Sequence, residues 1–169
     1  VRMAKYTLKI LNRFKASPEE ALDLCCGTGT AIKIFSERGV VMSGLDRSGA
    51  MLKQAKKKLR GRNIPLHRQS LPRFEITEEK TNGRVPLKQF DLVTCFYDSL
   101  NYLLTPRDLK AAFRNVYRHL RPAGWFIFDM NTPHALKTIW GAQPPFSGVK
   151  DDVAWIFRSE YFRENTSAN

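Results

Sequence analysis

The sequence predicts an α/β protein with a doubly wound, mainly parallel sheet and helices on both of its faces. Short apolar stretches alternate with stretches whose apolar residues recur at helical spacing, and this alternation is typical of parallel β-α-β units. The first apolar stretch enters a glycine turn at residues 22–30, and a helix follows the turn. The chain has 169 residues, of which 43% are hydrophobic, as expected for one globular domain.

The first half of the chain predicts two strand–helix units, preceded by a helix and followed by a strand. Ser48 stands at the N-cap position of the third helix, and Gly39 and Gly61 follow the ends of the second and third. In chain order the expected elements are helix 2–15, strand 21–25, helix 30–38, strand 40–45, helix 49–59 and a weak strand 64–68.

The second half continues the alternation after an irregular surface segment. Pro106 lies in the first turn of the expected helix, where proline is tolerated. Pro122, Ala123 and Gly124 predict a turn between this helix and the last strand of the sheet. The expected elements are segment 71–89, strand 90–96, helix 105–120 and strand 125–130.

The pattern changes after residue 131. A short helix at 133–140 and a loop at 141–150 lead to an aromatic-rich strand at 154–162. A strand this apolar needs a partner, and no second strand follows it. We therefore expect one domain over 1–169 with its core at 20–135. Residues 136–169 would begin a C-terminal extension, in a C-terminally shortened piece of a longer protein.

The glycine turn is the strongest functional signal. Glycines let the backbone approach a ligand closely, and the amide N–H groups that open a helix have no partner within the helix. Asp46 ends the next strand, where a carboxylate can accept hydrogen bonds from a ribose. The series predicts a pocket for a nucleoside-containing cofactor. The alternative is a glycine turn that only connects a strand to a helix.

A dinucleotide pocket is disfavoured by one residue. Its fingerprint is G-x-G-x-x-G/A, in which the third small residue lets helix and strand pack closely. Gly27 and Gly29 fit the first two positions, but Ile32 occupies the third. NAD is therefore not expected.

Three motifs together resemble class I S-adenosylmethionine (SAM)-dependent methyltransferases. Their cofactor loop usually follows E/D-x-G-x-G-x-G, and here Asp23 precedes Gly27 and Gly29, with Cys25 at the first glycine position. The stretches FDLVTCFYDSLNYL at 90–103 and HLRPAGWFIFDMN at 119–131 resemble the fourth and fifth strands of small bacterial and archaeal methyltransferase-domain proteins of unassigned substrate. The resemblance implies a Rossmann-like fold that here lacks its last strands.

The resemblance also implies which residues bind the cofactor. Asp23 would orient the loop or the cofactor's ammonium group, Asp46 would hold the ribose hydroxyls, and Ser70 stands where the family often has an adenine-binding Asp. Phe96 would lie near the reacting methyl, or else is an ordinary core aromatic. The implied cofactor-binding residues are Asp23, Cys25, Cys26, Gly27, Thr28, Gly29, Asp46, Arg47, Met51, Gln69, Ser70, Leu71 and Phe96.

Asp98 and Asn101 follow the fourth strand and are the acceptor-side catalytic candidates, with Tyr97 and Tyr102 as possible pocket walls. Asp98 would accept a proton or bind an amine, or would instead cap a short helix at 99–103. Methyl transfer mainly requires in-line alignment of the reacting atoms, so no nucleophilic triad is expected. The histidines are too scattered for a metal site, and His119 is expected to favour a helix C-terminus.

The charge leaves the partner open. The formal net charge is +12, and the basic residues lie mostly on predicted helices. A solvated basic face and a nucleic-acid surface both fit this distribution. A small-molecule acceptor is the leading prediction, with S-adenosylhomocysteine as the product. An RNA methyltransferase and a non-catalytic partner subunit are the alternatives. Three cysteines without disulfide or zinc spacing suggest the cytoplasm, and no apolar run is long enough for a membrane helix.

Overall fold

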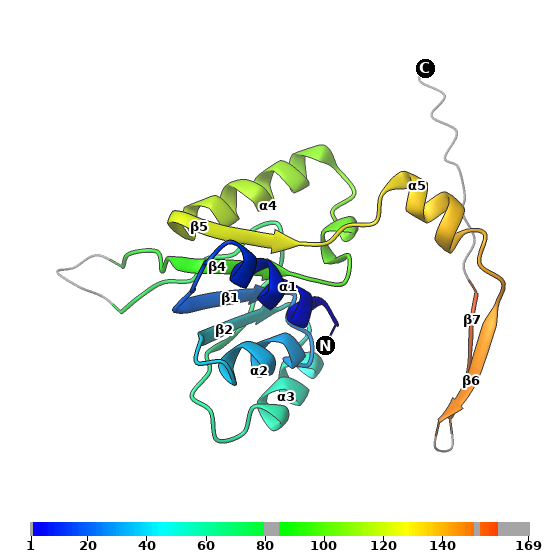
Figure 1. Ribbon diagram of the computed structural model, residues 1–169, viewed down its shortest axis with the longest axis horizontal. Coiled ribbons are helices and arrows are strands. Elements are labelled where there is room, and N and C mark those ends of the chain that lie inside the picture. The colour runs from blue at the N-terminus through cyan, green and yellow to red at the C-terminus, as the bar shows by residue number, and fades with distance from the viewer. Residues whose placement is uncertain (1, 80–84, 151–152, 159–169) are drawn as a thin grey trace. The chain divides into compact units, whose positions relative to one another are not determined.

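The computed structural model describes residues 2–79, 85–150 and 153–158, and it confirms the α/β class. Five strands form one sheet of order β3-β2-β1-β4-β5, and every neighbouring pair is parallel. The strands are β1 (Glu20–Leu24), β2 (Val41–Asp46), β3 (Leu66–Arg68), β4 (Phe90–Cys95) and β5 (Leu120–Phe128). Figure 1 shows β1, β2, β4 and β5 side by side.

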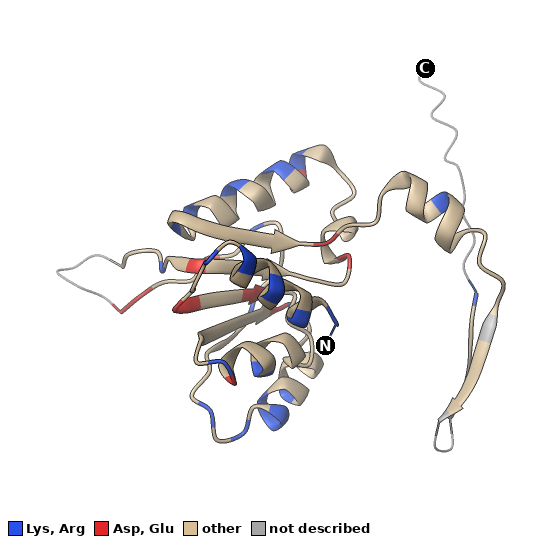
Figure 2. Cartoon of the chain, in the orientation of Figure 1, with Lys and Arg blue, Asp and Glu red and all other residues tan. Residues whose placement is uncertain are grey.

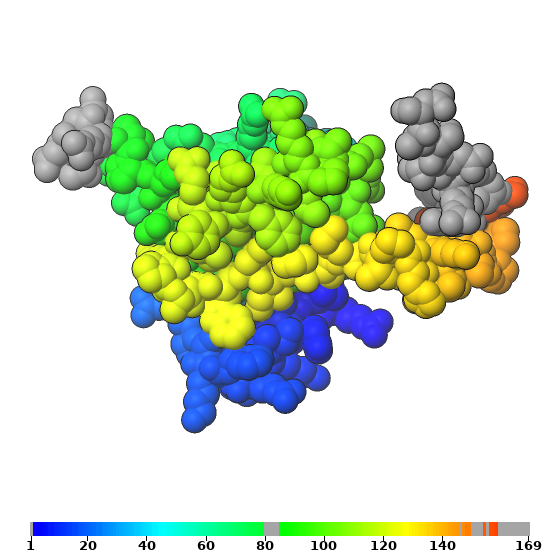
Figure 3. Space-filling model, turned by 90° about the horizontal axis from the view of Figure 1, so that it is seen from above, coloured from blue at the N-terminus to red at the C-terminus, as the bar shows by residue number. Residues whose placement is uncertain are grey.

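Two hydrophobic clusters cover the two faces of the sheet. Successive side chains of a strand point to opposite faces, so Leu92 of β4 joins one cluster and its neighbour Val93 joins the other. The first cluster includes residues of α1 (Arg2–Arg13), α2 (Thr30–Ser36) and α3 (Gly49–Lys58). The second includes residues of η1 (Ser99–Tyr102) and α4 (Pro106–Arg118). Figure 3 shows α4 and β5 next to each other on one face.

His119 occupies the C-cap position of α4, so its predicted place at a helix C-terminus is confirmed, but the ring makes other contacts there than the predicted ones. The ring follows α4 but is fully buried. Its Nδ1 donates to the Asn115 carbonyl at 2.8 Å, and its Nε2 accepts the Ile76 N–H at 3.1 Å. One nitrogen must donate and the other accept, which requires the neutral ring. His119 therefore connects α4 to the segment before β4, and it does not act as a cation at the helix end.

The predicted turn at residues 122–124 is wrong, because these residues lie inside β5. The register between β4 and β5 shifts between Phe90 and Leu92, which is the irregularity that a bulge produces. Ala123 has a φ of 62°, and a Cβ on Gly124 would lie 2.9 Å from the Arg121 carbonyl oxygen. Pro122 is tolerated because β5 is at the edge of the described sheet, where a missing N–H breaks no ladder.

Segment 71–89 was expected to be irregular, but part of it pairs with itself. The Lys88 N–H donates to the Ile76 carbonyl, the Glu78 N–H donates to the Pro86 carbonyl, and Thr77 forms an antiparallel bridge with Leu87. Residues 80–84 lie outside the described residues.

The chain divides into a core unit, Val1–Met130, and a C-terminal unit, Asn131–Asn169. The C-terminal unit contains α5 (Pro133–Ala135), a π-helical turn η2 (Leu136–Trp140), β6 (Phe146–Lys150) and β7 (Val153–Phe157). The loop expected at 141–150 therefore contains a strand, which pairs antiparallel with β7. The partner needed by the apolar strand precedes it, because a hairpin satisfies both strands locally. Of the strand expected at 154–162, residues 159–162 lie outside the described residues.

In the described part of the chain, no helix combines the length and the apolar character that a membrane span requires.

Candidate functional site

Two adjoining cavities lie at the carboxyl ends of β1, β2 and β4, and Cys25 and Gly27 line both. The loop cavity has a volume of about 410 Å³ and is also lined by Asp23, Cys26, Thr28, Ala31, Phe96 and Tyr97. The strand-tip cavity has a volume of about 520 Å³ and is also lined by Asp46, Arg47, Met51, Ser70, Leu71 and Ser99. The strand order reverses between β1 and β4, and this reversal is the usual ligand position in an open parallel sheet.

The glycine loop is shaped by left-handed residues. Gly27 has a φ of 53° and Gly29 a φ of 72°, and this region suits glycine. Gly29 also packs closely, because a Cβ there would lie 3.1 Å from Leu59 Cδ1. Cys25 adopts a φ of 53° although it has a Cβ, which costs of order 1–3 kcal/mol. The conformation explains why a glycine usually stands at this position in the resembling loops.

Lys58 holds the loop from the end of α3. Its Nζ donates to Thr28 Oγ1 and to Thr30 Oγ1, both at 2.7 Å. Because these groups are exposed, the bonds order the loop more than they stabilise the fold.

The mismatch at Ile32 has a structural explanation on β2. A Cβ on Gly44 would lie 2.4 Å from Ile32 Cδ1 and 2.8 Å from Leu66 Cδ2. The close approach of helix and strand is therefore made possible by a glycine in the strand, and the helix keeps a large residue. In the dinucleotide fingerprint the small residue lies in the helix.

Asp46 connects the glycine loop to the turn after β2. Its Oδ2 accepts the Gly27 N–H at 2.8 Å, and its Oδ1 accepts the Ser48 N–H at 2.8 Å. An ionised carboxylate has about four acceptor positions. The carboxylate can therefore accept further hydrogen bonds from a ligand in the strand-tip cavity without releasing the loop.

Asp23 is buried at the end of β1. Thr94 Oγ1 on the neighbouring strand β4 donates to Asp23 Oδ1 at 2.6 Å. Burial raises the pKa of Asp23 to about 7, the Thr94 bond opposes this increase, and the charge of Asp46 adds to it. A carboxyl group with this pKa can ionise when a cationic group enters the loop cavity.

The two neighbouring cysteines of the loop have opposite properties. A hydrogen bond with Cys95 is the main cause that holds the pKa of Cys25 below its usual value. Burial raises the pKa of Cys26. Cys25, Cys26 and Cys95 are all free thiols.

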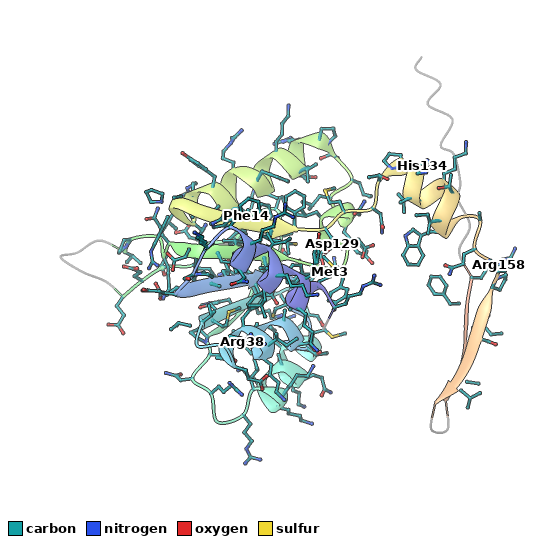
Figure 4. The ribbon with its side chains drawn as sticks, viewed as in Figure 1. Met3, Phe14, Arg38, Asp129, His134 and Arg158 are labelled. Atoms are coloured by element: carbon teal, nitrogen blue, oxygen red, sulfur yellow. The ribbon has the colours of Figure 1, made fainter. Side chains whose placement is uncertain are left out.

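The turn after β4 is built on Asp129, which sequence reasoning missed. Tyr97 and Asp98 are consecutive non-glycine residues with φ values of 59° and 52°. The Tyr97 N–H donates to Asp129 Oδ1 at 2.8 Å, and the Asp98 N–H donates to Asp129 Oδ2 at 2.9 Å. Figure 4 shows Asp129 just beyond the end of β5. The signal that could have found it is the one that singled out Asp46, an acid directly after an apolar strand.

Most of the expected cofactor-binding residues line the two cavities, and two do not. Gly29 contributes packing against α3. The Gln69 side chain donates to the Glu75 carbonyl and accepts the Glu75 N–H, so it stabilises a turn. Gln69 lines a separate cavity between residues 69–75 and α4.

The acceptor-side candidates are not brought into these cavities. Asp98 and Asn101 line neither one. Asp98 occupies the N-cap position of η1, but its side chain makes no capping bond. Their neighbours Tyr97, Ser99 and Tyr102 are lining residues instead. The residues on either side of Asp98 in the sequence therefore line the site, and Asp98 itself does not.

Charge and metal ligands complete the description of the site. Figure 2 shows Lys and Arg spread over α1, α3 and α4. Among the described residues, no group of three or more His, Cys, Asp or Glu side chains could hold a metal ion.

The parallel sheet, the glycine-rich first turn and the acid at the end of β2 define an α/β protein that binds a nucleoside-containing ligand. The profile of a family described as a methyltransferase domain matches residues 21–124. The chain belongs to this family, and it is a class I SAM-dependent methyltransferase domain.

Individual relatives agree with the family. The putative methyltransferase YqeM of Bacillus subtilis (strain 168) is 34% identical over 138 residues, which are 82% of this chain and 52% of that protein. A dTDP-3-amino-3,4,6-trideoxy-alpha-D-glucopyranose N,N-dimethyltransferase of Streptomyces venezuelae is 33% identical over 108 residues, or 64% of this chain and 40% of that protein. The chain thus spans about half the length or less of these curated relatives.

A solved structure shows the same fold. A SAM-dependent methyltransferase from Clostridium acetobutylicum ATCC 824 matches with a TM-score of 0.78 and 27% identity. The match covers 96% of this chain and 62% of that one.

Proposed function

We propose that this protein transfers a methyl group from SAM to a small molecule, with S-adenosylhomocysteine as the product. The observation that carries the proposal is the placement of Asp23 and Asp46 on adjoining cavities at the reversal of the strand order. The two volumes lie in the usual range for small-ligand sites, roughly 300–1,000 Å³. These two carboxylate groups accept hydrogen bonds, and they suit a ligand with an ammonium group at one end and a nucleoside at the other.

Each cavity then takes one end of the ligand. Asp46 accepts the ribose hydroxyls with the acceptor positions that Gly27 and Ser48 leave open. Met51 gives the adenine a polarizable apolar contact, and Ser70 and Leu71 line the far side. Asp23 faces the ammonium group from the loop cavity, and Phe96 lines the same cavity.

SAM supplies a methyl group that its sulfonium already activates. An attacking atom would bond to the methyl carbon as the carbon–sulfur bond breaks, and the electron pair of that broken bond would stay on the sulfur of S-adenosylhomocysteine. The protein therefore has to align the reacting atoms in line and exclude water, for which Phe96 and Tyr97 are placed on the wall of the loop cavity. A general base is needed only if the attacking atom carries a proton at the working pH.

We propose an amine-bearing small molecule as the acceptor. Two relatives at 30% and 33% identity are named as N,N-dimethyltransferases of dTDP-amino sugars. No described feature favours RNA over a small molecule, since the basic residues are spread over several helices. The free thiols support a reducing compartment, and we propose the cytoplasm.

Calorimetry tests the cofactor assignment. The full-length protein should bind SAM and S-adenosylhomocysteine. Asp46→Asn should bind both about 10- to 100-fold more weakly, because hydrogen bonds to a charged group contribute roughly 1.5–3 kcal/mol each. Asp108→Asn is the matched control, because Asp108 is a half-buried aspartate in the first turn of α4 that lines neither cavity. Absence of binding by the unaltered protein would reject the proposal.

Transfer of a labelled methyl group tests the acceptor class. The protein is incubated with methyl-labelled SAM and either nucleotide-linked amino sugars or total RNA. Label is expected on an amine of a small molecule. Label recovered in RNA would overturn the choice of acceptor while leaving the cofactor assignment intact.

A further inference from the structure

The turn that leaves β4 has a backbone conformation that its residues do not favour. Tyr97 and Asp98 both lie in the left-handed region, and neither is a glycine. Two such residues in a row persist only where the surroundings compensate for the strain. The compensation has to come from contacts outside the turn.

Asp129 supplies these contacts. Its two carboxylate oxygens each accept one of the two consecutive amide N–H groups, at 2.8 Å from Tyr97 and 2.9 Å from Asp98. Hydrogen bonds to an ionised acceptor are stronger than those between neutral groups. Asp129 forms no ion pair among the described residues, so its charge is directed to these two amides.

The turn forms part of the wall of both cavities. Phe96 and Tyr97 line the loop cavity, and Ser99 lines the strand-tip cavity. Ser99 Oγ also donates to the Phe96 carbonyl at 2.8 Å, which closes the turn. A change in the φ angles of Tyr97 and Asp98 would therefore move wall residues of both cavities.

We infer that Asp129 is a positioning residue, whose carboxylate fixes the turn after β4 in the shape that binds SAM and presents the acceptor. This role rests on the proposed function. Asp129 acts through the backbone amides of Tyr97 and Asp98 and lines neither cavity itself.

Asp91 provides a matched control at the other end of β4. Its Oδ2 accepts the N–H groups of Glu19 and Glu20, at 3.0 and 2.9 Å. It thus makes the same kind of bond to two consecutive amides, far along the strand from both cavities. Loss of Asp91 should weaken the fold without changing the site.

The test compares Asp129→Asn with Asp91→Asn by hydrogen exchange and calorimetry. An Asn side chain offers one acceptor and turns its NH₂ toward the other amide. We expect Asp129→Asn to exchange the Tyr97 and Asp98 amides at least about 10-fold faster. It should also bind SAM about 10-fold more weakly, as expected for one lost charge-assisted bond. Asp91→Asn should lower the melting temperature and leave SAM affinity within about twofold.

A glycine rescue separates positioning from a general loss of stability. Glycine adopts positive φ without strain. The double variant Asp129→Asn with Asp98→Gly should therefore bind SAM more tightly than Asp129→Asn alone. The single variant Asp98→Gly is the reference for the affinity that is regained. If Asp129→Asn does not fold, the double variant is compared directly with Asp98→Gly, and equal SAM affinity supports the inference. The inference is overturned if the two amides keep their protection in Asp129→Asn, if its affinity falls no further than that of Asp91→Asn, or if the glycine rescues nothing. Because hydrogen exchange needs no SAM, failure of the unaltered protein to bind SAM would reject the proposed function separately.

Discussion

The two ends of the parallel sheet hold their acidic residues in different ways. At the amino end, Glu20 and Asp91 are paired with cations: Lys88 Nζ lies 2.8 Å from Glu20, and Arg121 contacts both acids, with 2.9 Å to Asp91. At the carboxyl end, Asp23, Asp46 and Asp129 form no ion pair among the described residues. They are held by Thr94 or by backbone N–H groups.

The pKa values show the same contrast. The Lys88 hydrogen bond is the main cause that lowers the pKa of Glu20. Burial acts to raise the pKa of Asp91, but the Glu20 N–H and Arg121 outweigh it and the pKa is lowered. Burial raises the pKa of Asp23 to about 7. The amino end therefore uses its charges to stabilise the fold, and the carboxyl end keeps carboxylate groups that a ligand can still pair with.

The largest expected effect is the pH dependence that Asp23 causes. Its folded pKa of about 7 lies above the ordinary 3.8. Below pH 3.8 Asp23 is protonated in both the folded and the unfolded protein, so its burial carries no ionisation penalty. Between pH 3.8 and 7 the free energy of unfolding falls as pH rises, and above pH 7 this loss of stability is complete. Three pKa units correspond to about 4 kcal/mol. Asp23→Asn cannot ionise and should gain up to this amount over the unaltered protein at pH 8, and little at pH 4.

Urea unfolding at pH 4, 6 and 8 checks this prediction. Asp91→Asn is the control from the other end of the sheet. The lowered pKa of Asp91 contributes stability above its unfolded pKa that is lost in acid, so its variant should differ most from the unaltered protein near neutral pH and least in acid. A stability difference for Asp23→Asn that stays constant with pH would contradict the assignment.

A smaller effect is expected at the amino end from Arg121→Ala. This change removes the shared partner of Glu20 and Asp91. These side chains are a quarter to a third exposed, so we expect a loss of about 1–2 kcal/mol after allowing for solvent screening. SAM affinity should stay within about twofold. Thermal and urea unfolding together with calorimetry measure both quantities.

Arg118→Ala is the matched control for this variant. Arg118 is an exposed arginine of α4 without an ion pair among the described residues, and its loss should change stability by less than about 0.5 kcal/mol. Equal losses in the two variants, or a fall in SAM affinity specific to Arg121→Ala, would break the proposed division between the two ends.

The smallest effect is expected from Cys25→Gly at the carboxyl end. Glycine removes the left-handed strain of Cys25 but adds freedom to the unfolded chain, so the net gain should be at most about 1 kcal/mol. Cys26→Gly is the contrast, because the buried Cys26 thiol fills the space above Gly44 and its loss should destabilise by about 1–2 kcal/mol. Melting temperatures decide between them. A loss in Cys25→Gly as large as in Cys26→Gly would show that the thiol contributes more than the strain costs.

Features that depend on neighbouring residues were predictable from the sequence. The strands β1, β2 and β4 begin and end within about two residues of their expected bounds, because each is a largely apolar segment between turn residues. The Ser48 cap and the glycine loop follow from local backbone chemistry in the same way. The position of Asp46 at the strand end follows from the strand boundary.

Features that depend on residues far apart in the chain were not predictable from the sequence. The bulge in β5 results from pairing with β4, and the sequence shows only Pro, Ala and Gly in a row. The hairpin partner of β7 lies in a stretch whose glycine and prolines predict a loop. His119 accepts a hydrogen bond from the Ile76 N–H across 43 positions, and no sequence periodicity indicates this contact.

The sequence by itself determined the fold class, the order in which the candidate site residues follow the strands, and the methyltransferase family. It could do so because alternating periodicity and the glycine loop are local signals. Only the tertiary structure decided how that loop is supported. Gly44 makes room for Ile32, Thr94 donates a hydrogen bond to Asp23, and Asp129 holds the turn after β4 across 31 and 32 positions. The physical reason is that hydrogen bonds and packing act between atoms close in space, whereas a sequence pattern records only neighbours along the chain.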